Sequence, residues 1–125
     1  MKKYQVLIID DEIRIGLLIK KLIHWDEIGL ECMDVVDNGE IAINNIRKGK
    51  YPDIVITDIR MPKIDGLQFI SMTKDIGCNI KYIVISGYKE FEYAHRAMQY
   101  GVENYLLKPV NENELNKDLK KIVDE

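Results

Sequence analysis

Apolar residues occur in two alternating patterns along this chain of 125 residues. Five short runs are apolar at nearly every position, which is typical of strands buried on both faces of a parallel sheet. These runs cover residues 5–9, 30–36, 54–57, 80–85 and 104–107. Between them, apolar residues recur every three or four positions, as they do on one face of a helix. Helices are expected around residues 15–22 and 41–46, over 67–75 and 90–100, and from 112 onwards. The alternation predicts a single α/β domain.

Polar residues within the runs indicate the order of the strands. The first, third and fourth runs are the most uniformly apolar and suit the middle of the sheet. Glu31 and Asp34 interrupt the second run, and Asn104 begins the fifth, so these two suit its edges. The order 2-1-3-4-5 places the three apolar strands in the middle and the two interrupted strands at the edges. Right-handed crossovers then place helices on both faces of the sheet. This is a flavodoxin-like, doubly wound (βα)5 fold with a five-stranded parallel sheet, in which ligands bind beyond the carboxyl ends of strands one and three.

Polar side chains stand at the carboxyl ends of these strands. Asp10 and Asp11 follow the first, Asp58 follows the third, Ser86 ends the fourth, and Lys108 follows the fifth. Two like charges about 4 Å apart repel by roughly 4 kcal/mol at an effective dielectric of 20, so one lysine cannot balance three carboxylates. An open site of oxygen ligands suits Mg²⁺. A carboxylate nucleophile, a magnesium ion, a lysine and a hydroxyl together make a site for phosphoryl transfer.

Composition narrows the class of protein. The hydrophobic fraction of 46% and the charged fraction of 31% are ordinary for a globular protein. A net charge of −3 without a block of basic residues argues against nucleic-acid binding by this domain itself. No apolar run is long enough to span a membrane, and the first residues do not form a signal peptide, so a cytoplasmic protein is expected. Cys32 and Cys78 lack metal-ligand spacing and are expected to be reduced thiols.

Four motifs together resemble the receiver domain of bacterial two-component response regulators. They are Asp-Asp at residues 10–11, Asp-Ile-Arg-Met-Pro-Lys-Ile-Asp-Gly at 58–66, Ser-Gly at 86–87 and Lys-Pro at 108–109. Each motif is modest evidence alone, but all four in order and at the family's spacing are highly specific. The resemblance runs from Val6 to the last helix, and it implies a single receiver domain over residues 1–125.

The resemblance also implies a role for each matching residue. Asp58 would accept a phosphoryl group from a phosphohistidine on a sensor histidine kinase. Asp11 and Asp58 would ligate Mg²⁺ directly, Asp10 would do so mainly through water, and Arg60 would offer its backbone carbonyl. The domain would therefore catalyse only its own phosphorylation and dephosphorylation, and it would not be an enzyme acting on a separate substrate.

Three further positions would make the switch of such a domain. Lys108 would contact the phosphoryl oxygens, Ser86 would move toward them, and Tyr105 would then turn inward. Ser86 stands where many relatives carry threonine, and the missing methyl group would loosen its coupling to Tyr105. Gly87 would leave room for the incoming group.

A narrower resemblance concerns the output of the switch. Residues 86–94, Ser-Gly-Tyr-Lys-Glu-Phe-Glu-Tyr-Ala, and 106–110, Leu-Leu-Lys-Pro-Val, are similar to regulators that continue into an arabinose-regulator-type helix-turn-helix domain. No such domain is present in this chain, so a fragment of a longer transcriptional regulator is expected. The phosphorylated form is expected to form a homodimer through the helix at 90–100, the strand at 104–107 and the last helix. Charged and polar residues suited to that contact are Lys89, Glu92, Arg96, Asn104 and Lys117.

Plainer interpretations exist for single residues. Asp10 and Asp11 suit the start of a helix, Ser86 suits a turn, and Tyr105 alone suits a core aromatic. Lys108 before a proline suits a loop, although a cis peptide bond there would aim the lysine inward.

Other residues are expected to have only a structural place. His24 and His95 are expected at the surface, and Phe91, Ala94 and Met98 are expected to face the core. The first helix should bury Ile15, Leu18, Ile19 and Leu22.

Three other functions fit the sequence less well. A phosphatase of the haloacid-dehalogenase kind would carry Asp-x-Asp after the first strand and a cap insertion, and this chain has neither. A flavin-binding domain would need a phosphate loop at the position where this chain has acids. A receiver that no longer takes phosphate would not be expected to keep Asp58, the acidic pair and Lys108 together.

Overall fold

A computed structural model of the chain describes residues 2–87 and 91–125. Its helices and strands alternate as the sequence predicts, with one added helix. The elements are β1 Tyr4–Ile9, α1 Ile13–Leu22, α2 Trp25–Ile28, β2 Leu30–Val36, α3 Gly39–Arg47, β3 Ile54–Thr57, α4 Gly66–Ile76, β4 Lys81–Ser86, α5 Phe91–Gln99, β5 Asn104–Leu107 and α6 Glu112–Asp124.

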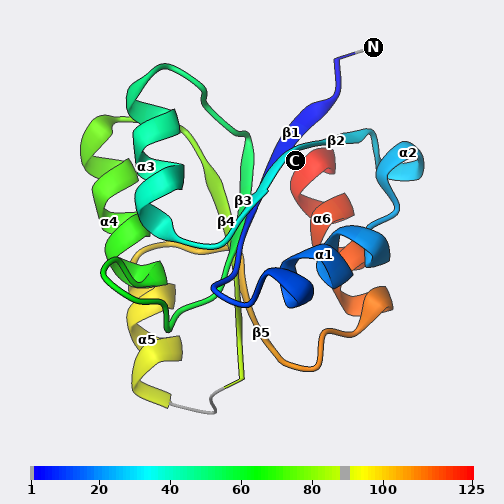
Figure 1. Cartoon of the computed structure of the whole chain (residues 1–125). Helices are drawn as coiled ribbons and strands as arrows, with labels where there is room; N and C mark the ends of the chain where they lie inside the picture. The colour runs from blue at the N-terminus through cyan, green and yellow to red at the C-terminus, as the bar shows by residue number, and fades with distance from the viewer. Residues whose placement is uncertain (1, 88–90) are drawn as a thin grey trace.

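The five strands form one parallel sheet in the order β2-β1-β3-β4-β5, which confirms the predicted topology. Helices α3, α4 and α5 cover one face, and α1, α2 and α6 cover the other (Figure 1). Successive side chains of β1 therefore enter different cores: Leu7 and Ile9 pack toward α3–α5, whereas Val6 and Ile8 pack toward α1 and α6. The central strands read as continuous apolar runs because both of their faces are buried.

The short helix α2 is not predicted from the sequence, whose helical pattern covers residues 15–22 and ends before it. Four residues are too few to show a helical period. The indole Nε1 of Trp25 donates a hydrogen bond of 2.8 Å to the carbonyl of Lys20, and Gly29 ends the helix with a φ of 90°. A positive φ is favourable for glycine and costly for most other residues.

Side-chain contacts join α2 to the start of α6. The amide of Asn116 accepts a hydrogen bond from the backbone N–H of His24 and donates one to the carbonyl of Leu22, both of 2.8 Å. His24 Nε2 lies 2.7 Å from a carboxylate oxygen of Glu112. His24, which was expected at the surface, is thus only partly exposed, while His95 is exposed. These bonds hold the layer of α1, α2 and α6 together.

Two residues predicted to face the core are exposed instead. In α1, Ile19 is buried but Leu18 is 52% exposed. In α5, Ala97 is buried and Met98 is 56% exposed. A neighbouring position on a helix is turned by about 100°, so a residue at the margin of an apolar stripe can face outward. The predicted core position of the Phe91 side chain lies outside what the structure describes. Within the described residues, none of the helices has the length and apolar character to cross a membrane.

Candidate functional site

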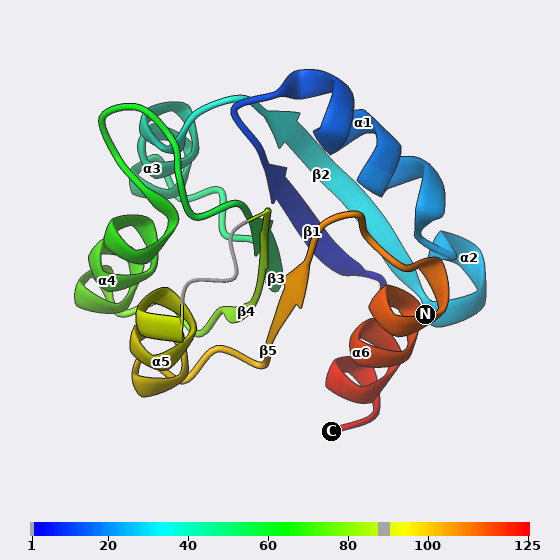
Figure 2. The same ribbon diagram turned by 90° about the horizontal axis from the view of Figure 1, so that it is seen from below.

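Four strand ends meet at one edge of the sheet, which faces the viewer in Figure 2. Backbone hydrogen bonds position two of them: the N–H of Asp10 donates to the carbonyl of Val36 at 3.1 Å, and that of Asp58 donates to the carbonyl of Ile9 at 3.0 Å. At β5, the N–H of Lys108 donates to the carbonyl of Ser86 at 2.9 Å. The strand ladder therefore continues into the site and fixes the backbone from which its side chains extend.

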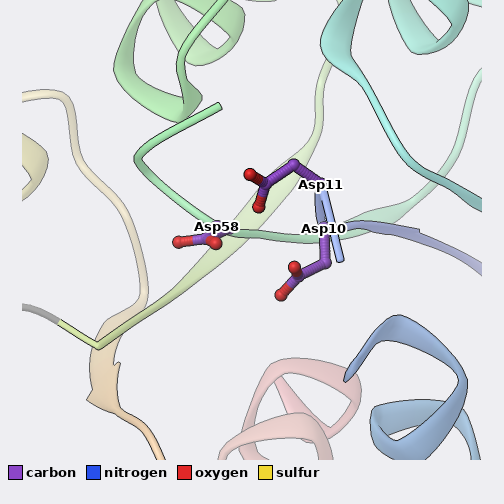
Figure 3. A group of neighbouring side chains, drawn as sticks. All are labelled: Asp10, Asp11 and Asp58. Atoms are coloured by element: carbon purple, nitrogen blue, oxygen red, sulfur yellow. The ribbon is translucent and has the colours of Figure 1, made fainter. Parts of the chain in front are cut away.

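The carboxyl groups of Asp10, Asp11 and Asp58 lie together at the ends of β1 and β3 (Figure 3). One oxygen from each lies within 4.8 Å of one from each of the others. Asp10 is 1% exposed and Asp58 is 6% exposed, whereas Asp11 is open to solvent. The sequence placed the three side chains at this edge correctly, but it gave no indication that the first of the adjacent acids would be the buried one.

Lys108 reaches this cluster from β5. Its Nζ atom lies 3.0 Å from Asp10 Oδ2 and 3.0 Å from Asp58 Oδ2. The Lys108–Pro109 peptide bond is cis, as expected. Burial tends to lower the pKa of the Lys108 ammonium, but its contacts with Asp10 and Asp58 outweigh burial and hold that pKa above its ordinary value. Lys108 is thus a fixed positive charge.

Asp58 remains an unfavourable anion despite that contact. Its Oδ1 accepts a hydrogen bond of 2.7 Å from the N–H of Ile59, and its Oδ2 accepts one from Lys108. Burial nevertheless raises the pKa of the Asp58 carboxyl, and Asp10 adds to the rise, against the opposing effect of Lys108 and Ile59. Asp10 Oδ2 is buried and, among the described residues, has the Lys108 ion pair but no well-aligned hydrogen bond. Three carboxylates with one lysine and an incompletely satisfied oxygen fit the ligand set of a hard divalent cation such as Mg²⁺.

This electrostatic state predicts that Asp58→Asn stabilises the fold without metal. A carboxyl whose pKa is raised by folding favours the folded state while protonated, and it loses that contribution as the pH rises through its folded pKa. Asparagine keeps an oxygen for Ile59 and carries no charge. We therefore expect the midpoint of thermal unfolding of the variant to exceed that of the wild type by a few degrees at pH 7. The difference should shrink toward pH 4, because the raised pKa of the wild-type carboxyl means that a growing fraction of it is protonated as the pH falls.

Thermal unfolding of both proteins in EDTA at the two pH values measures this. In saturating Mg²⁺ the wild type should have the higher midpoint of unfolding, because only the wild type keeps all three carboxylates for the ion. A variant less stable than the wild type at pH 7 in EDTA would contradict the assignment of Asp58 as a strained anion.

The other predicted site residues differ in how deeply they are buried. Ser86 is fully buried at the end of β4. Tyr105 is half-buried in β5 and packs against the core beneath α3–α5. Among the described residues, a Cβ atom on Gly87 would approach only Lys108 Cδ, at 4.0 Å. Arg60 is exposed in the loop after β3.

Two features of the site were missed from the sequence. The sequence shows Gly66 only as the last residue of the motif at 58–66, but a Cβ atom there would lie 2.2 Å from the carbonyl oxygen of Asp58. The guanidinium of Arg60 lies 5.4 Å from the centroid of the Tyr93 ring in α5. A signal for the close approach at Gly66 is present in the sequence, because this glycine directly follows an aspartate that caps a helix. Two backbone segments can lie this close only where a residue has no Cβ. The second joins residues distant in sequence, and no local pattern indicates it.

Known proteins share this fold and sequence. The profile of the response regulator receiver domain family matches residues 6–120. The uncharacterized transcriptional regulatory protein YesN of Bacillus subtilis is 41% identical over 122 residues, which are 98% of this chain and 33% of YesN. The transcriptional regulatory protein HptR of Staphylococcus aureus is 34% identical over 96% of this chain and 46% of HptR. The chain therefore spans between a third and a half of these relatives.

A solved structure agrees with the sequence matches. The REC domain of AraT, a response regulator from Geobacillus stearothermophilus, superposes with a TM-score of 0.86 and is 34% identical. The match covers 97% of this chain and 93% of that domain. With the sequence profile covering most of its length, the chain belongs to the response regulator receiver domain family.

Proposed function

We propose that this domain accepts a phosphoryl group on Asp58 from a phosphohistidine of a sensor histidine kinase, with Mg²⁺, and so controls a transcriptional output. The observation that carries the proposal is the buried Asp58 carboxylate, held by Lys108 Nζ at 3.0 Å beside two further carboxylates. A receiver domain is a signalling domain, and the reaction proposed here modifies the domain itself.

The transfer uses Asp58 as the nucleophile. An oxygen of its carboxylate forms a bond to phosphorus while the phosphorus–nitrogen bond of the phosphohistidine breaks, and the electron pair leaves with the imidazole. Asp11 and Asp58 would hold Mg²⁺ directly, Asp10 would do so through water and Arg60 through its backbone carbonyl, and the bound ion would supply positive charge for the phosphoryl oxygens. Lys108 contacts the same oxygens, and its raised pKa keeps it charged during the transfer.

The phosphoryl group then acts as a switch. It adds negative charge and acceptor oxygens beside the buried hydroxyl of Ser86. Movement of Ser86 toward those oxygens makes space for Tyr105, whose half-buried ring already packs against the core on that face. The surface that changes is formed by α5, β5 and α6.

We place the proposed homodimer on this surface. Glu92, Arg96 and Lys117 are exposed there, and Asn104 donates a hydrogen bond of 2.6 Å to Asp118 within the same chain. Lys89, which was also expected at this contact, lies outside the described residues. The names of the relatives describe transcriptional regulators. The relatives' own chains extend well beyond the region that matches this domain. An output domain that binds DNA would therefore lie in the remainder of the parent protein.

The proposal is tested with beryllofluoride, whose beryllium completes its coordination with a carboxylate oxygen and mimics a phosphoryl group. Amide NMR spectra of the wild type should change on adding it with Mg²⁺, first at residues around Asp58, and should not change in EDTA. Asp58→Asn should show no response in either condition. A wild type that fails to bind the mimic in saturating Mg²⁺ would leave a receiver domain that only binds partners.

A further inference from the structure

We propose that Thr57 is a positioning residue for the phosphorylation of Asp58. Its buried hydroxyl holds the peptide plane between Asp58 and Ile59, and that plane orients the carboxylate that takes the phosphoryl group. The inference rests on the phosphorylation of Asp58 proposed above. It gives a role to the last residue of β3, which the proposed reaction does not otherwise use.

A hydroxyl group at the end of β3 requires an explanation. The three preceding residues of the strand are Ile54, Val55 and Ile56, and all four side chains are buried, that of Thr57 completely. Because side chains alternate along a strand, Thr57 shares the face of Val55, which packs against the core beneath α3–α5. Valine has nearly the same shape and would fill this position without the cost of burying a polar group. The reason for the hydroxyl must therefore lie in its hydrogen bond.

The partner of this hydroxyl is the backbone of Asp58. Thr57 Oγ1 donates a hydrogen bond of 2.9 Å to the carbonyl oxygen of Asp58. The same oxygen lies at the tightest point of the loop after β3, since a Cβ atom on Gly66 would be 2.2 Å from it. Close packing against Gly66 leaves little room on that side for water to replace the hydroxyl. Without the hydroxyl, this carbonyl would lose a buried hydrogen bond, and the peptide would tend to rotate.

The peptide bond between Asp58 and Ile59 transmits the constraint to the carboxylate. The C=O and N–H groups of a trans peptide point in opposite directions in one plane, so a fixed carbonyl also fixes the direction of the N–H. Here the N–H of Ile59 donates a hydrogen bond of 2.7 Å to Asp58 Oδ1. The carbonyl of Ile59 accepts one of 2.7 Å from the N–H of Gly66. Thr57 and Gly66 therefore hold the backbone on both sides of the N–H that binds the carboxylate.

The orientation of the carboxylate matters for the reaction. With Oδ1 held by Ile59, the carboxylate of Asp58 is restrained from turning about its Cβ–Cγ bond. Its Oδ2 then remains 3.0 Å from Lys108 Nζ, where an incoming phosphoryl group would meet the nucleophile and the ammonium together. A nucleophile that is already oriented loses less conformational freedom on reaching the transition state. Thr57 would thus act on the reaction only through the orientation of Asp58.

Two NMR measurements test this role: the amide proton shift of Ile59 in EDTA, and the affinity for beryllofluoride in saturating Mg²⁺. Thr57→Val removes the hydroxyl and keeps the shape of the side chain. The Ile59 amide proton should then move upfield, because its hydrogen bond to Asp58 weakens, and the affinity should fall about five- to tenfold. Thr57→Ser keeps the hydroxyl, so it should retain the Ile59 shift and bind the mimic within about twofold of the wild type.

Thr73→Val is the matched control. Thr73 is also completely buried, and its hydroxyl donates to the carbonyls of Phe69 and Ile70 within α4. The variant loses a buried hydroxyl outside the site, so its midpoint of thermal unfolding should fall. Its Ile59 amide shift and its affinity for the mimic should match those of the wild type. The control therefore separates a loss of stability from a loss of orientation.

Four results would overturn the proposal. They are an Ile59 amide that does not move in Thr57→Val, an unchanged affinity in that variant, an equally weak affinity in Thr57→Ser, and an equal loss of affinity in Thr73→Val. If the wild type itself does not bind the mimic, the phosphorylation proposal fails, and the Ile59 shift in EDTA alone decides whether Thr57 orients Asp58. The two failures are therefore distinguishable.

Discussion

Replacing Lys108 with methionine is expected to destabilise the fold by about 2–3 kcal/mol at pH 7 without Mg²⁺. Methionine keeps most of the apolar stem and removes the ammonium that lies 3.0 Å from both Asp10 Oδ2 and Asp58 Oδ2. Both carboxylates are more than nine-tenths buried, so each is left in a poorly solvated position beside another anion. The midpoint of thermal unfolding should fall by roughly 10 °C, as measured by calorimetry in EDTA.

Two further measurements identify the cause of this loss. The destabilisation should fade as the pH falls, because protonation of Asp58, whose pKa is already raised by burial, removes the unpaired charge. Mg²⁺ should also recover part of the stability by supplying the missing cation. Lys117→Met, at an exposed position of α6, is the matched control and should change stability little. If Lys108→Met unfolds at the wild-type temperature in EDTA at pH 7, the lysine does not offset the acidic cluster.

The second large effect is expected from Gly66→Ala. The new methyl group would lie 2.2 Å from the carbonyl oxygen of Asp58 and 3.0 Å from the Cα atom of Ile59. Those contacts are with backbone, which cannot rotate away as a side chain would. The N–H of Gly66 also donates a hydrogen bond of 2.7 Å to the carbonyl of Ile59, so the helix start and the loop are held together at this point. We expect a loss of about 3 kcal/mol, measured by urea unfolding.

Gly66→Ala should also weaken Mg²⁺ binding, because the loop that moves carries Asp58 and the carbonyl of Arg60. Gly87→Ala provides the control, since within residues 2–87 and 91–125 its Cβ atom would meet nothing closer than Lys108 Cδ at 4.0 Å. Its stability should stay within about 0.5 kcal/mol of the wild type. Equal stability of Gly66→Ala and the wild type would show that the loop can relax without cost.

The strand order could be predicted from the sequence because it depends on which runs are apolar throughout. Glu31 and Asp34 marked an edge strand, and the structure places β2 at the edge. The positions of Asp10, Asp58 and Lys108 followed in turn, because the carboxyl ends of parallel strands meet at one edge of the sheet. Periodicity and strand ends are local features, and a single sequence contains them.

What the sequence could not predict depends on contacts between distant segments or on fine orientation. The outward direction of Leu18 and Met98 depends on how α1 and α5 are turned against the sheet, which an apolar stripe does not specify. The stacking of Arg60 on Tyr93 joins a loop to a helix far along the chain. The close approach of Gly66 to Asp58 arises from the path of the loop after β3. Such features become visible only when the backbone is in place.

The central claim is that Asp58 is the residue that takes the phosphoryl group. Incubation with acetyl phosphate and Mg²⁺, followed by intact-mass measurement, tests it most directly. The wild type should gain the mass of one phosphoryl group, and the adduct should be labile and absent in EDTA and in Asp58→Asn. An adduct of the same yield on Asp58→Asn, or none on the wild type, would contradict the claim.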